Sequence, residues 1–244
     1  MIDLHVHILP GLDDGPENWV TALKMARLAE ADGLTAIVAT PHLFRHRRVC
    51  QGEMNSAASI RAAVRELRQV LAEAGVKVSI HPGCEVPLFP ELLEMLHQGA
   101  LLTLNDGGRY LCLEMPDTVI PPATEEVVFQ LGLQGVTPIL AHPERHPVFR
   151  EMPEKLVRLL HLGCLAQITA SSLVGGFGRQ VAKFTEKLVK GGYVQLVASD
   201  AHDARGRPPL LSPALKKLAR LVGESRAWDM VSSLPERIIR GEPL

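Results

Sequence analysis

Short apolar runs, separated by longer segments of helical periodicity, constrain the fold of this 244-residue chain more than any other feature. Between the runs, apolar residues recur every three or four positions, which is typical of helices with one buried face. This alternation predicts βαβ units around a parallel sheet. Seven runs rich in β-branched residues are expected to be strands: 2–8, 34–39, 76–80, 110–114, 136–141, 165–169 and 193–198.

The alternation is not interrupted by a linker-like segment or by an internal repeat, so we expect one domain over residues 1–244. Seven strand–helix rounds predict an α/β fold, a distorted relative of the eight-stranded (β/α) barrel. Residues 212–244 are expected to form two helices with a break near Gly223, packed on the outside of the barrel. In such folds the functional side chains lie where the strands end, at their C-terminal edge.

Composition excludes several classes of protein. The 26 Lys and Arg residues against 27 Asp and Glu give a formal net charge of −1, which argues against a nucleic-acid binder. No apolar run approaches the roughly 20 residues that a membrane span needs, and the N-terminal residues lack a signal-peptide pattern, so we expect a cytoplasmic protein without membrane insertion. The four cysteines form no Cys-x-x-Cys pair, which indicates neither a disulfide framework nor a zinc ribbon.

Ionisable residues follow six of the seven predicted strands. His, Asp and Glu are a minority of the chain, with 10 His and 27 Asp or Glu, so chance does not explain this placement. In a strand, residues two apart point to the same face, so that His5 and His7 can reach one metal ion. The strand-end set consists of His5, His7, His42, Glu85, Glu114, His142, Asp200 and His202.

Three carboxylates in this set, Glu85, Glu114 and Asp200, would repel one another and lose hydration if buried together. Bound divalent cations remove that problem. Imidazole and carboxylate ligands without a thiolate suit manganese, iron or zinc, and this number of ligands requires two or three ions. Asp14, beside Gly15, is interpreted from its spacing alone as a turn carboxylate.

Arginines are concentrated near the same strand ends. Arg145 closely follows His142, Arg207 closely follows His202, and the segment 45–48 contains Arg45, Arg47 and Arg48. Guanidinium groups make paired hydrogen bonds to phosphate oxygens, so the pattern predicts an anionic substrate. For the 45–48 segment, solvated loop charges remain an alternative interpretation.

The motifs together resemble those of the PHP (polymerase and histidinol phosphatase) superfamily, and within it the bacterial manganese-dependent protein tyrosine phosphatases of capsule and exopolysaccharide loci. The resemblance covers residues 1 to about 210. It implies a distorted seven-stranded barrel that holds three metals, manganese foremost, with iron, zinc or cobalt as substitutes. The motifs that carry it are residues 1–10 with Asp13-Asp14-Gly15, then residues 39–42, 141–145, 167–169 with Gly176-Phe177-Gly178, 198–202 and the turn Gly206-Arg207-Pro208.

The resemblance also implies roles for individual residues. Arg145 and Arg207 would hold the substrate phosphate, with Arg45 and Arg47 as further substrate contacts. Asp200 and His202 would take part in catalysis as proton donors, while a metal-bound hydroxide attacks phosphorus. Asp14 joins the ligands, so that the metal-binding set becomes His5, His7, Asp14, His42, Glu85, Glu114, His142, Asp200 and His202.

We expect from this resemblance that the chain hydrolyses phosphotyrosine on a protein, the flexible tail of a bacterial tyrosine kinase. The alternative is a small-molecule phosphomonoesterase such as histidinol phosphatase. A metal-stabilised regulatory module is disfavoured, because the ligand set and both arginines are complete. Nucleic-acid processing is disfavoured by the charge and by only ten aromatic residues for base stacking.

Overall fold

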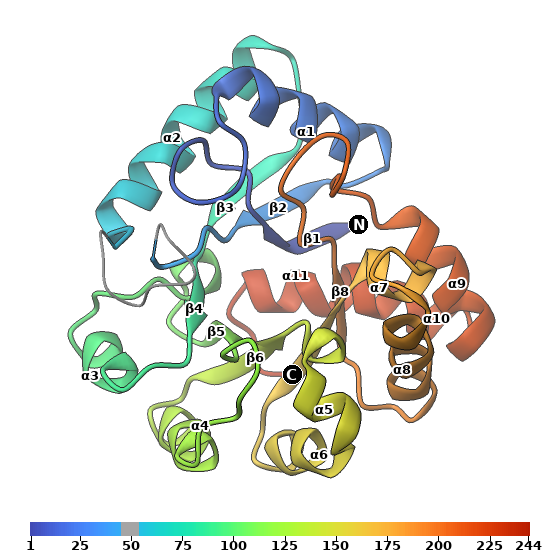
Figure 1. The fold of residues 1–244 in the computed structure, drawn as a ribbon. Helices are drawn as coiled ribbons and strands as arrows, with labels where there is room; N and C mark the ends of the chain where they lie inside the picture. The colour runs from blue at the N-terminus through green and yellow to red at the C-terminus, as the bar shows by residue number, and fades with distance from the viewer. Residues whose placement is uncertain (45–53) are drawn as a thin grey trace.

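The computed structural model describes residues 1–44 and 54–244, which form an α/β fold with parallel strands (Figure 1). Three strands make one sheet in the order β1-β2-β3: β1 (Ile2–Val6), β2 (Ala36–Ala39) and β3 (Ser79–Pro82). Five make a second sheet in chain order: β4 (Glu85–Pro87), β5 (Tyr110–Glu114), β6 (Thr137–Ala141), β7 (Leu165–Thr169) and β8 (Leu196–Ala198).

The strand count differs from the seven predicted. Among the described residues there are eight strands in two sheets, and isolated bridges, Val6 to Ala201 and His42 to Glu85, link the sheets in place of a continuous ladder that would close a barrel. The additional strand is β4, which is only three residues long and so carries no periodic signal. It is separated from β3 by Gly83, where an added Cβ would lie 2.8 Å from the Val38 side chain.

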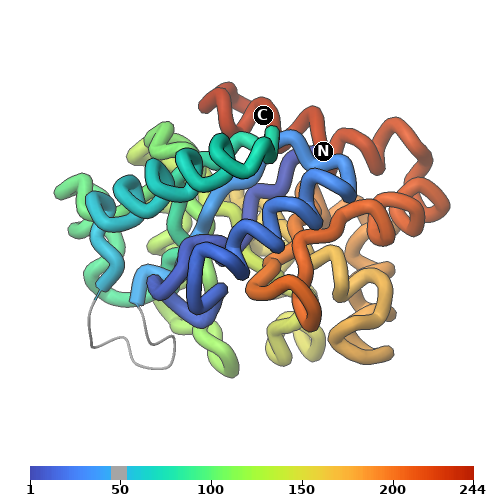
Figure 2. Tube along the Cα trace, turned by 90° about the horizontal axis from the view of Figure 1, so that it is seen from above, coloured from blue at the N-terminus to red at the C-terminus, as the bar shows by residue number. Residues whose placement is uncertain are grey.

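Helices surround the two sheets, as Figures 1 and 2 show. Asn18 and Ser56 cap the two longest, accepting hydrogen bonds from the backbone N–H groups of Thr21 and Ser59. No helix of the described residues is long and apolar enough to span a membrane. The helices up to residue 190 are α1 (Trp19–Ala31), α2 (Ala57–Glu73), α3 (Leu92–His97), α4 (Thr124–Leu133), α5 (Pro147–Glu151), α6 (Pro153–His161), α7 (Ala170–Val174) and α8 (Arg179–Lys190), with 3-10 turns η1 (Leu104–Asp106) and η2 (Pro143–Arg145).

The C-terminal segment confirms the predicted break at Gly223, whose φ of +86° favours glycine. The second predicted helix is divided into three parts. Ile238 packs with inward side chains of both sheets, including Leu4, Val38 and Ile139, so the last helix covers the interior between the sheets. The segment comprises α9 (Ser212–Val222), α10 (Glu224–Trp228), the π-helical turn η3 (Asp229–Ser233) and α11 (Leu234–Ile239).

Asp32, at the C-terminal end of α1, anchors the start of α9. Its carboxylate accepts hydrogen bonds from the backbone N–H of Leu211 at 2.7 Å and of Ser212 at 2.9 Å, and from the Ser212 hydroxyl. A carboxylate at a helix N-terminus satisfies free N–H groups and interacts favourably with the helix dipole. Asp32 therefore ties the C-terminal helices to the first βα unit.

We predict that Asp32→Ala lowers the free energy of unfolding by about 2 kcal/mol, because the N–H groups at the start of α9 lose their acceptor. Urea denaturation followed by circular dichroism measures this change. Asp229→Ala, which removes a carboxylate from η3, is the control. An unchanged urea midpoint for Asp32→Ala would show that α9 is held by its apolar contacts alone.

Candidate metal centre

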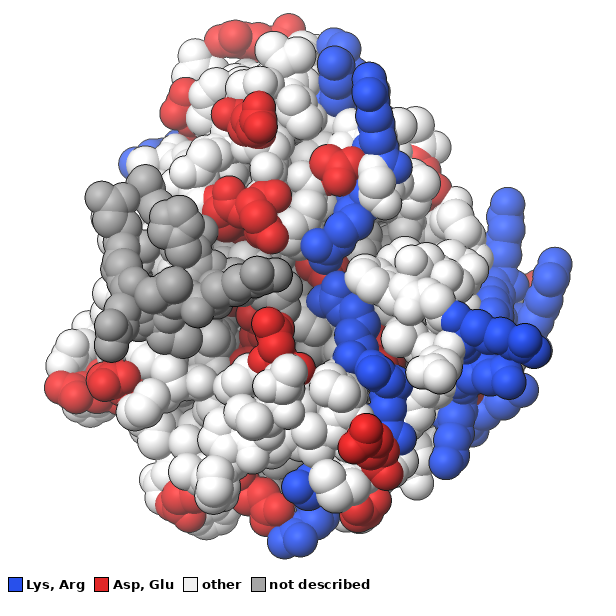
Figure 3. All heavy atoms as spheres, in the orientation of Figure 1, with Lys and Arg blue, Asp and Glu red and all other residues white. Residues whose placement is uncertain are grey.

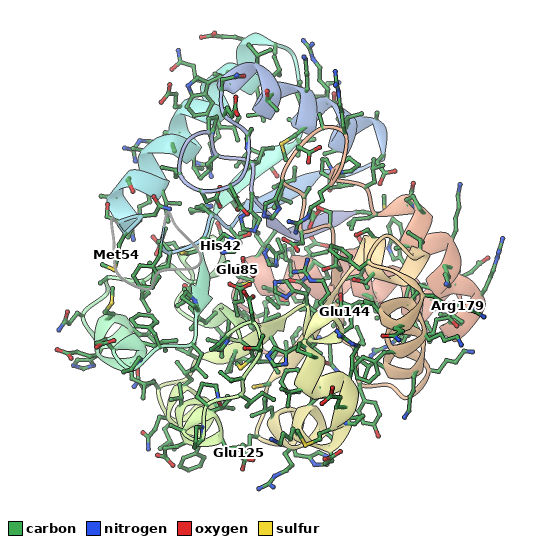
Figure 4. The ribbon with its side chains drawn as sticks, in the orientation of Figure 1. His42, Met54, Glu85, Glu125, Glu144 and Arg179 are labelled. Carbon is green, nitrogen blue, oxygen red and sulfur yellow. The ribbon has the colours of Figure 1, made fainter. Side chains whose placement is uncertain are left out.

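The nine predicted metal ligands converge at the C-terminal ends of the strands. His5 lies in β1 with His7 directly after it, and Glu114 is the last residue of β5. Glu85 corrects the sequence prediction in one respect: it begins β4 and does not end the third strand. Figure 4 shows His42 and Glu85 next to each other at the centre of the molecule. All the predicted ligands except Asp14 are buried.

The first group of side chains brings His5 and His7 together with two carboxylates. The two Nε2 atoms are 3.2 Å apart. Glu85 Oε2 lies 3.4 Å from each of them, and Asp200 Oδ1 lies 3.5 Å from His5 Nε2 and 3.4 Å from His7 Nε2. Two imidazole nitrogens and two carboxylate oxygens thus surround one point. This arrangement suits a divalent cation that accepts both nitrogen and oxygen ligands.

A second group forms around Glu85. Its Oε2 lies 2.9 Å from His42 Nδ1, and its Oε1 lies 2.9 Å from His142 Nε2. Glu114 approaches the same two rings, at 3.7 Å from His42 Nδ1 and 3.6 Å from His142 Nε2. The two oxygens of Glu85 therefore face different imidazoles, so one carboxylate connects the first group to the second.

The third group contains Asp14, which its spacing alone did not predict as a ligand. Asp14 Oδ1 lies 3.2 Å from His202 Nε2 and 3.6 Å from His42 Nε2. The ring of His202 stacks on that of His7 with centroids 3.9 Å apart. Potential ligand atoms of His7, Asp14, His42 and His202 all lie within 4.8 Å of one another.

Unsatisfied buried atoms show that this donor set fits metal ions. Glu85 Oε2, His42 Nε2 and His202 Nε2 are buried and make no hydrogen bond with the described residues, although other ligand atoms lie within 4 Å of each. Leaving such atoms without a partner costs about 1–3 kcal/mol each. Glu85 Oε2 lies in the groups formed with His5, His7 and His42 Nδ1, and the two Nε2 atoms lie in the group around Asp14, so divalent cations in these groups would satisfy all three atoms.

The charges in the cluster depend on one another. Burial raises the pKa of Glu85 and Asp200, but imidazoles around Glu85, and Arg145 with imidazoles around Asp200, outweigh burial and hold both pKa values well below the ordinary range. Burial lowers the pKa of His5 and His7, and neighbouring carboxylates outweigh it, so both pKa values are raised well above normal. The carboxylates thus require positive charge beside them, from protons or from metal ions.

Two residues that orient the histidines were missed as functional residues. Asp13 Oδ2 lies 2.6 Å from His7 Nδ1, and Gln167 Oε1 lies 2.9 Å from His5 Nδ1. When Nδ1 donates to these oxygens, Nε2 presents its lone pair to the cluster. Both residues lie in motifs of the family resemblance, Asp13 beside Asp14 and Gln167 in β7, the one strand without a predicted ligand, but neither was assigned a role.

Cys112 is a further buried residue beside the cluster. Its Sγ and potential ligand atoms of His5 and Glu85 lie within 4.8 Å of one another. Cys112 precedes Glu114 by two residues in β5, so strand alternation would have placed both on one face. Burial raises the pKa of the Cys112 thiol, which favours a neutral thiol beside the set of nitrogen and oxygen atoms.

Two of the predicted arginines lie at the edge of the cluster. Nitrogen atoms of Arg145 and Arg207 lie 2.8 and 2.5 Å from Asp200 Oδ2. Both guanidinium groups lie over the ring of Phe177, at 4.8 and 5.9 Å from its centroid. Phe177 was missed as a functional residue, because only the fold brings it to both arginines. The predicted substrate contacts Arg45 and Arg47 lie outside the described residues.

Comparison with known proteins gives relatives along the whole chain. The chain is 34% identical over 244 residues to the tyrosine-protein phosphatase YwqE of Bacillus subtilis, covering 100% of this chain and 93% of YwqE. It is 33% identical over 211 residues to the putative tyrosine-protein phosphatase CapC of Staphylococcus aureus, covering 86% of this chain and 80% of CapC.

A solved structure agrees with these relatives. It comes from work on YwqE from Bacillus subtilis and CpsB from Streptococcus pneumoniae, described as unique metal-dependent tyrosine phosphatases. It matches the model with a TM-score of 0.94 at 34% identity, over 100% of this chain and 96% of the solved one. The resemblance drawn from the motifs is thereby confirmed. The family model for capsular polysaccharide synthesis, CpsB/CapC, matches residues 1–240, and the chain therefore belongs to the CpsB/CapC family.

Proposed function

We propose that this chain is a metal-dependent protein tyrosine phosphatase that acts in the synthesis of capsular or extracellular polysaccharide. The observation that carries the proposal is the cluster of nine imidazole and carboxylate side chains, all buried except Asp14, with Arg145 and Arg207 at its edge. The 34% identity to the tyrosine-protein phosphatase YwqE along the whole chain supports the same conclusion.

The proposed cofactor is a set of three manganese ions held by all nine ligands, because the side chains form three overlapping groups around Glu85, Asp14 and Asp200. When bound, such ions supply a nucleophile at neutral pH by lowering the pKa of water, and they neutralise charge on the phosphoryl oxygens. Asp13 and Gln167 keep His7 and His5 in the orientation that ligation requires.

The proposed roles of the arginines follow from their position. Arg145 and Arg207 bind the phosphoryl oxygens, and the Phe177 ring limits where their guanidinium groups can lie. A phenolate is a good leaving group, so weak proton donation is enough. We propose His202 as the donor, because the low pKa of Asp200 keeps that carboxylate ionised. Arg45 and Arg47 stay predicted substrate contacts.

The proposed substrate is phosphotyrosine on the flexible tail of a bacterial tyrosine kinase. A cytoplasmic location fits this proposal, because the described cysteines Cys84, Cys112 and Cys164 are free thiols. We also propose that residues 1–244 act as one phosphatase domain, a distorted barrel whose two sheets are linked by the isolated Val6–Ala201 and His42–Glu85 bridges, with residues 212–244 packed on it.

Metal removal provides the first test of this function. We predict that dialysis against EDTA lowers kcat/KM on a phosphotyrosine peptide by about 100-fold or more, because the hydrolytic nucleophile depends on the metals. Addition of Mn²⁺ should restore the activity. Histidinol phosphate serves as the comparison substrate. Full activity in EDTA, or a clear preference of the reconstituted enzyme for histidinol phosphate, would contradict the proposal.

His42 tests the proposed ligand set, because its ring faces both Glu85 and Asp14. Loss of a side chain that only orients a ligand costs 10- to 100-fold in metal affinity or activity, so we predict a loss of about 100-fold or more for His42→Ala. Kinetics after reconstitution with Mn²⁺ measure the effect. His97→Ala removes an exposed histidine and is the matched control. Wild-type activity of His42→Ala would show that the cluster is not the catalytic site.

The pH dependence of stability tests the charge balance of the cluster. Burial lowers the pKa values of His5 and His7, but the adjacent carboxylates raise them by more than burial lowers them, so both pKa values lie well above normal. Protonation therefore stabilises the metal-free fold below the unfolded pKa of about 6.5, and this contribution is lost as pH rises through the raised pKa values.

We predict that the Tm of EDTA-treated protein falls as the pH rises above about 6.5 and through the raised pKa values of the two histidines, because they lose their protons. Mn²⁺ should restore the Tm at the upper pH, since bound metal replaces the protons. Differential scanning calorimetry of metal-free and metal-loaded protein measures both effects. A metal-free Tm that stays constant or rises over this range would be the contrary result.

A further inference from the structure

A groove between α5 and α8 lies outside the metal centre. It has a volume of about 470 Å³, and its floor includes Pro147 and the buried Phe184. Three cations, Arg150, Lys183 and Lys187, line it against a single acid, Glu151. We propose that this groove and the adjoining face of α8 bind an acidic stretch of the substrate polypeptide, next to the phosphotyrosine held by Arg145 and Arg207.

The first observation is the charge on α8. Arg179, Lys183, Lys187 and Lys190 are all exposed and follow one another at intervals of three or four residues, so they share one side of the helix. The one acid of the helix, Glu186, already pairs with Lys217 on α9 at 2.6 Å. Figure 3 shows lysine and arginine side chains gathered over α8 and α9.

The second observation is that these cations are unpaired. In the described part of the chain, no acidic side chain lies within 4 Å of Arg179, Lys183, Lys187 or Lys190; Glu186, whose ion pair is with Lys217, interacts with Lys190 only over a longer distance. Like charges three or four residues apart on a helix destabilise it. In a chain whose formal net charge is −1, such a segregated cationic face attracts an anionic partner and orients it on approach.

The third observation is continuity with the proposed substrate arginines. Arg150, in the groove wall, donates hydrogen bonds to the carbonyl oxygens of Glu144 and Arg145. Phe177, under both substrate arginines, precedes the first residue of α8 by two positions. A polypeptide whose phosphotyrosine lies at Arg145 would therefore pass Arg150 and continue into the groove.

This inference rests on the proposed function and specifies the substrate more closely. The cationic side of α8 runs for about 16 Å, because a helix rises about 1.5 Å per residue. An extended chain covers this length with about five residues. The hollow shape and the connection to the arginines favour a peptide over a membrane surface as the occupant. The substrate would carry Asp or Glu within about five residues of the phosphotyrosine.

The test compares two phosphotyrosine peptides that differ only in five flanking positions, Glu in one and Gln in the other, with the flank placed on either side in turn. For the better orientation, we expect wild-type kcat/KM to be about tenfold higher for the Glu peptide. The double variant Lys183→Glu and Lys187→Glu should abolish this preference, since it reverses two charges, and leave hydrolysis of p-nitrophenyl phosphate unchanged. The preference should also weaken at high salt.

The matched control is Lys24→Glu with Arg27→Glu on α1, which changes the net charge equally at two exposed positions and should keep the preference. Equal kcat/KM for the two peptides in wild type, or equal preferences in wild type and the α8 variant, overturns the inference alone. Hydrolysis of neither peptide overturns the proposed function and this inference with it. A third outcome also overturns the inference: the wild type binds phosphatidylserine vesicles, the α8 variant does not, and the two have the same peptide preference. The surface would then bind a membrane.

Discussion

The structure depends on the burial of carboxylates beside imidazoles in one small space. Moving a charged group out of water costs several kcal/mol even after relaxation, so Glu85 and Asp200 are stable there only with positive charge alongside. Protonated histidines supply it in part, and divalent cations supply it more completely, because they also satisfy the atoms left without hydrogen bonds, such as Glu85 Oε2. The same constraint explains why stability, metal binding and pH are linked in this fold.

The backbone accepts strain to bring these side chains together. His142 and Asp200 are both left-handed, with φ of 38° and 53°, a conformation that costs about 1–3 kcal/mol for residues other than glycine. Each is held by its N–H group: His142 donates to the Gln167 carbonyl at 2.8 Å and Asp200 to the His5 carbonyl at 2.9 Å. The neighbouring strands thus set the turns that direct both ligands into the cluster.

The sequence predicted which side chains would converge, because parallel strands deliver the residues after them to one edge, so that a local pattern such as His5-Val6-His7 has a spatial consequence. It predicted less well wherever the signal was short or depended on distant segments. The three residues of β4 are too few for a periodic pattern, and Glu85 was therefore attached to the preceding strand. Asp13, Gln167 and Phe177 act through contacts that only the folded chain makes.

Asp200 connects the two halves of the site. Its Oδ1 faces the Nε2 atoms of His5 and His7, while its Oδ2 forms ion pairs with Arg145 and Arg207 and accepts a hydrogen bond from Arg207. A change of charge at His5 and His7 therefore affects the ion pairs that the same carboxylate makes with Arg145 and Arg207. Asp200 therefore fixes the two guanidinium groups beside the imidazoles of His5 and His7, so that the arginines and the proposed metal ligands form one continuous set of charges.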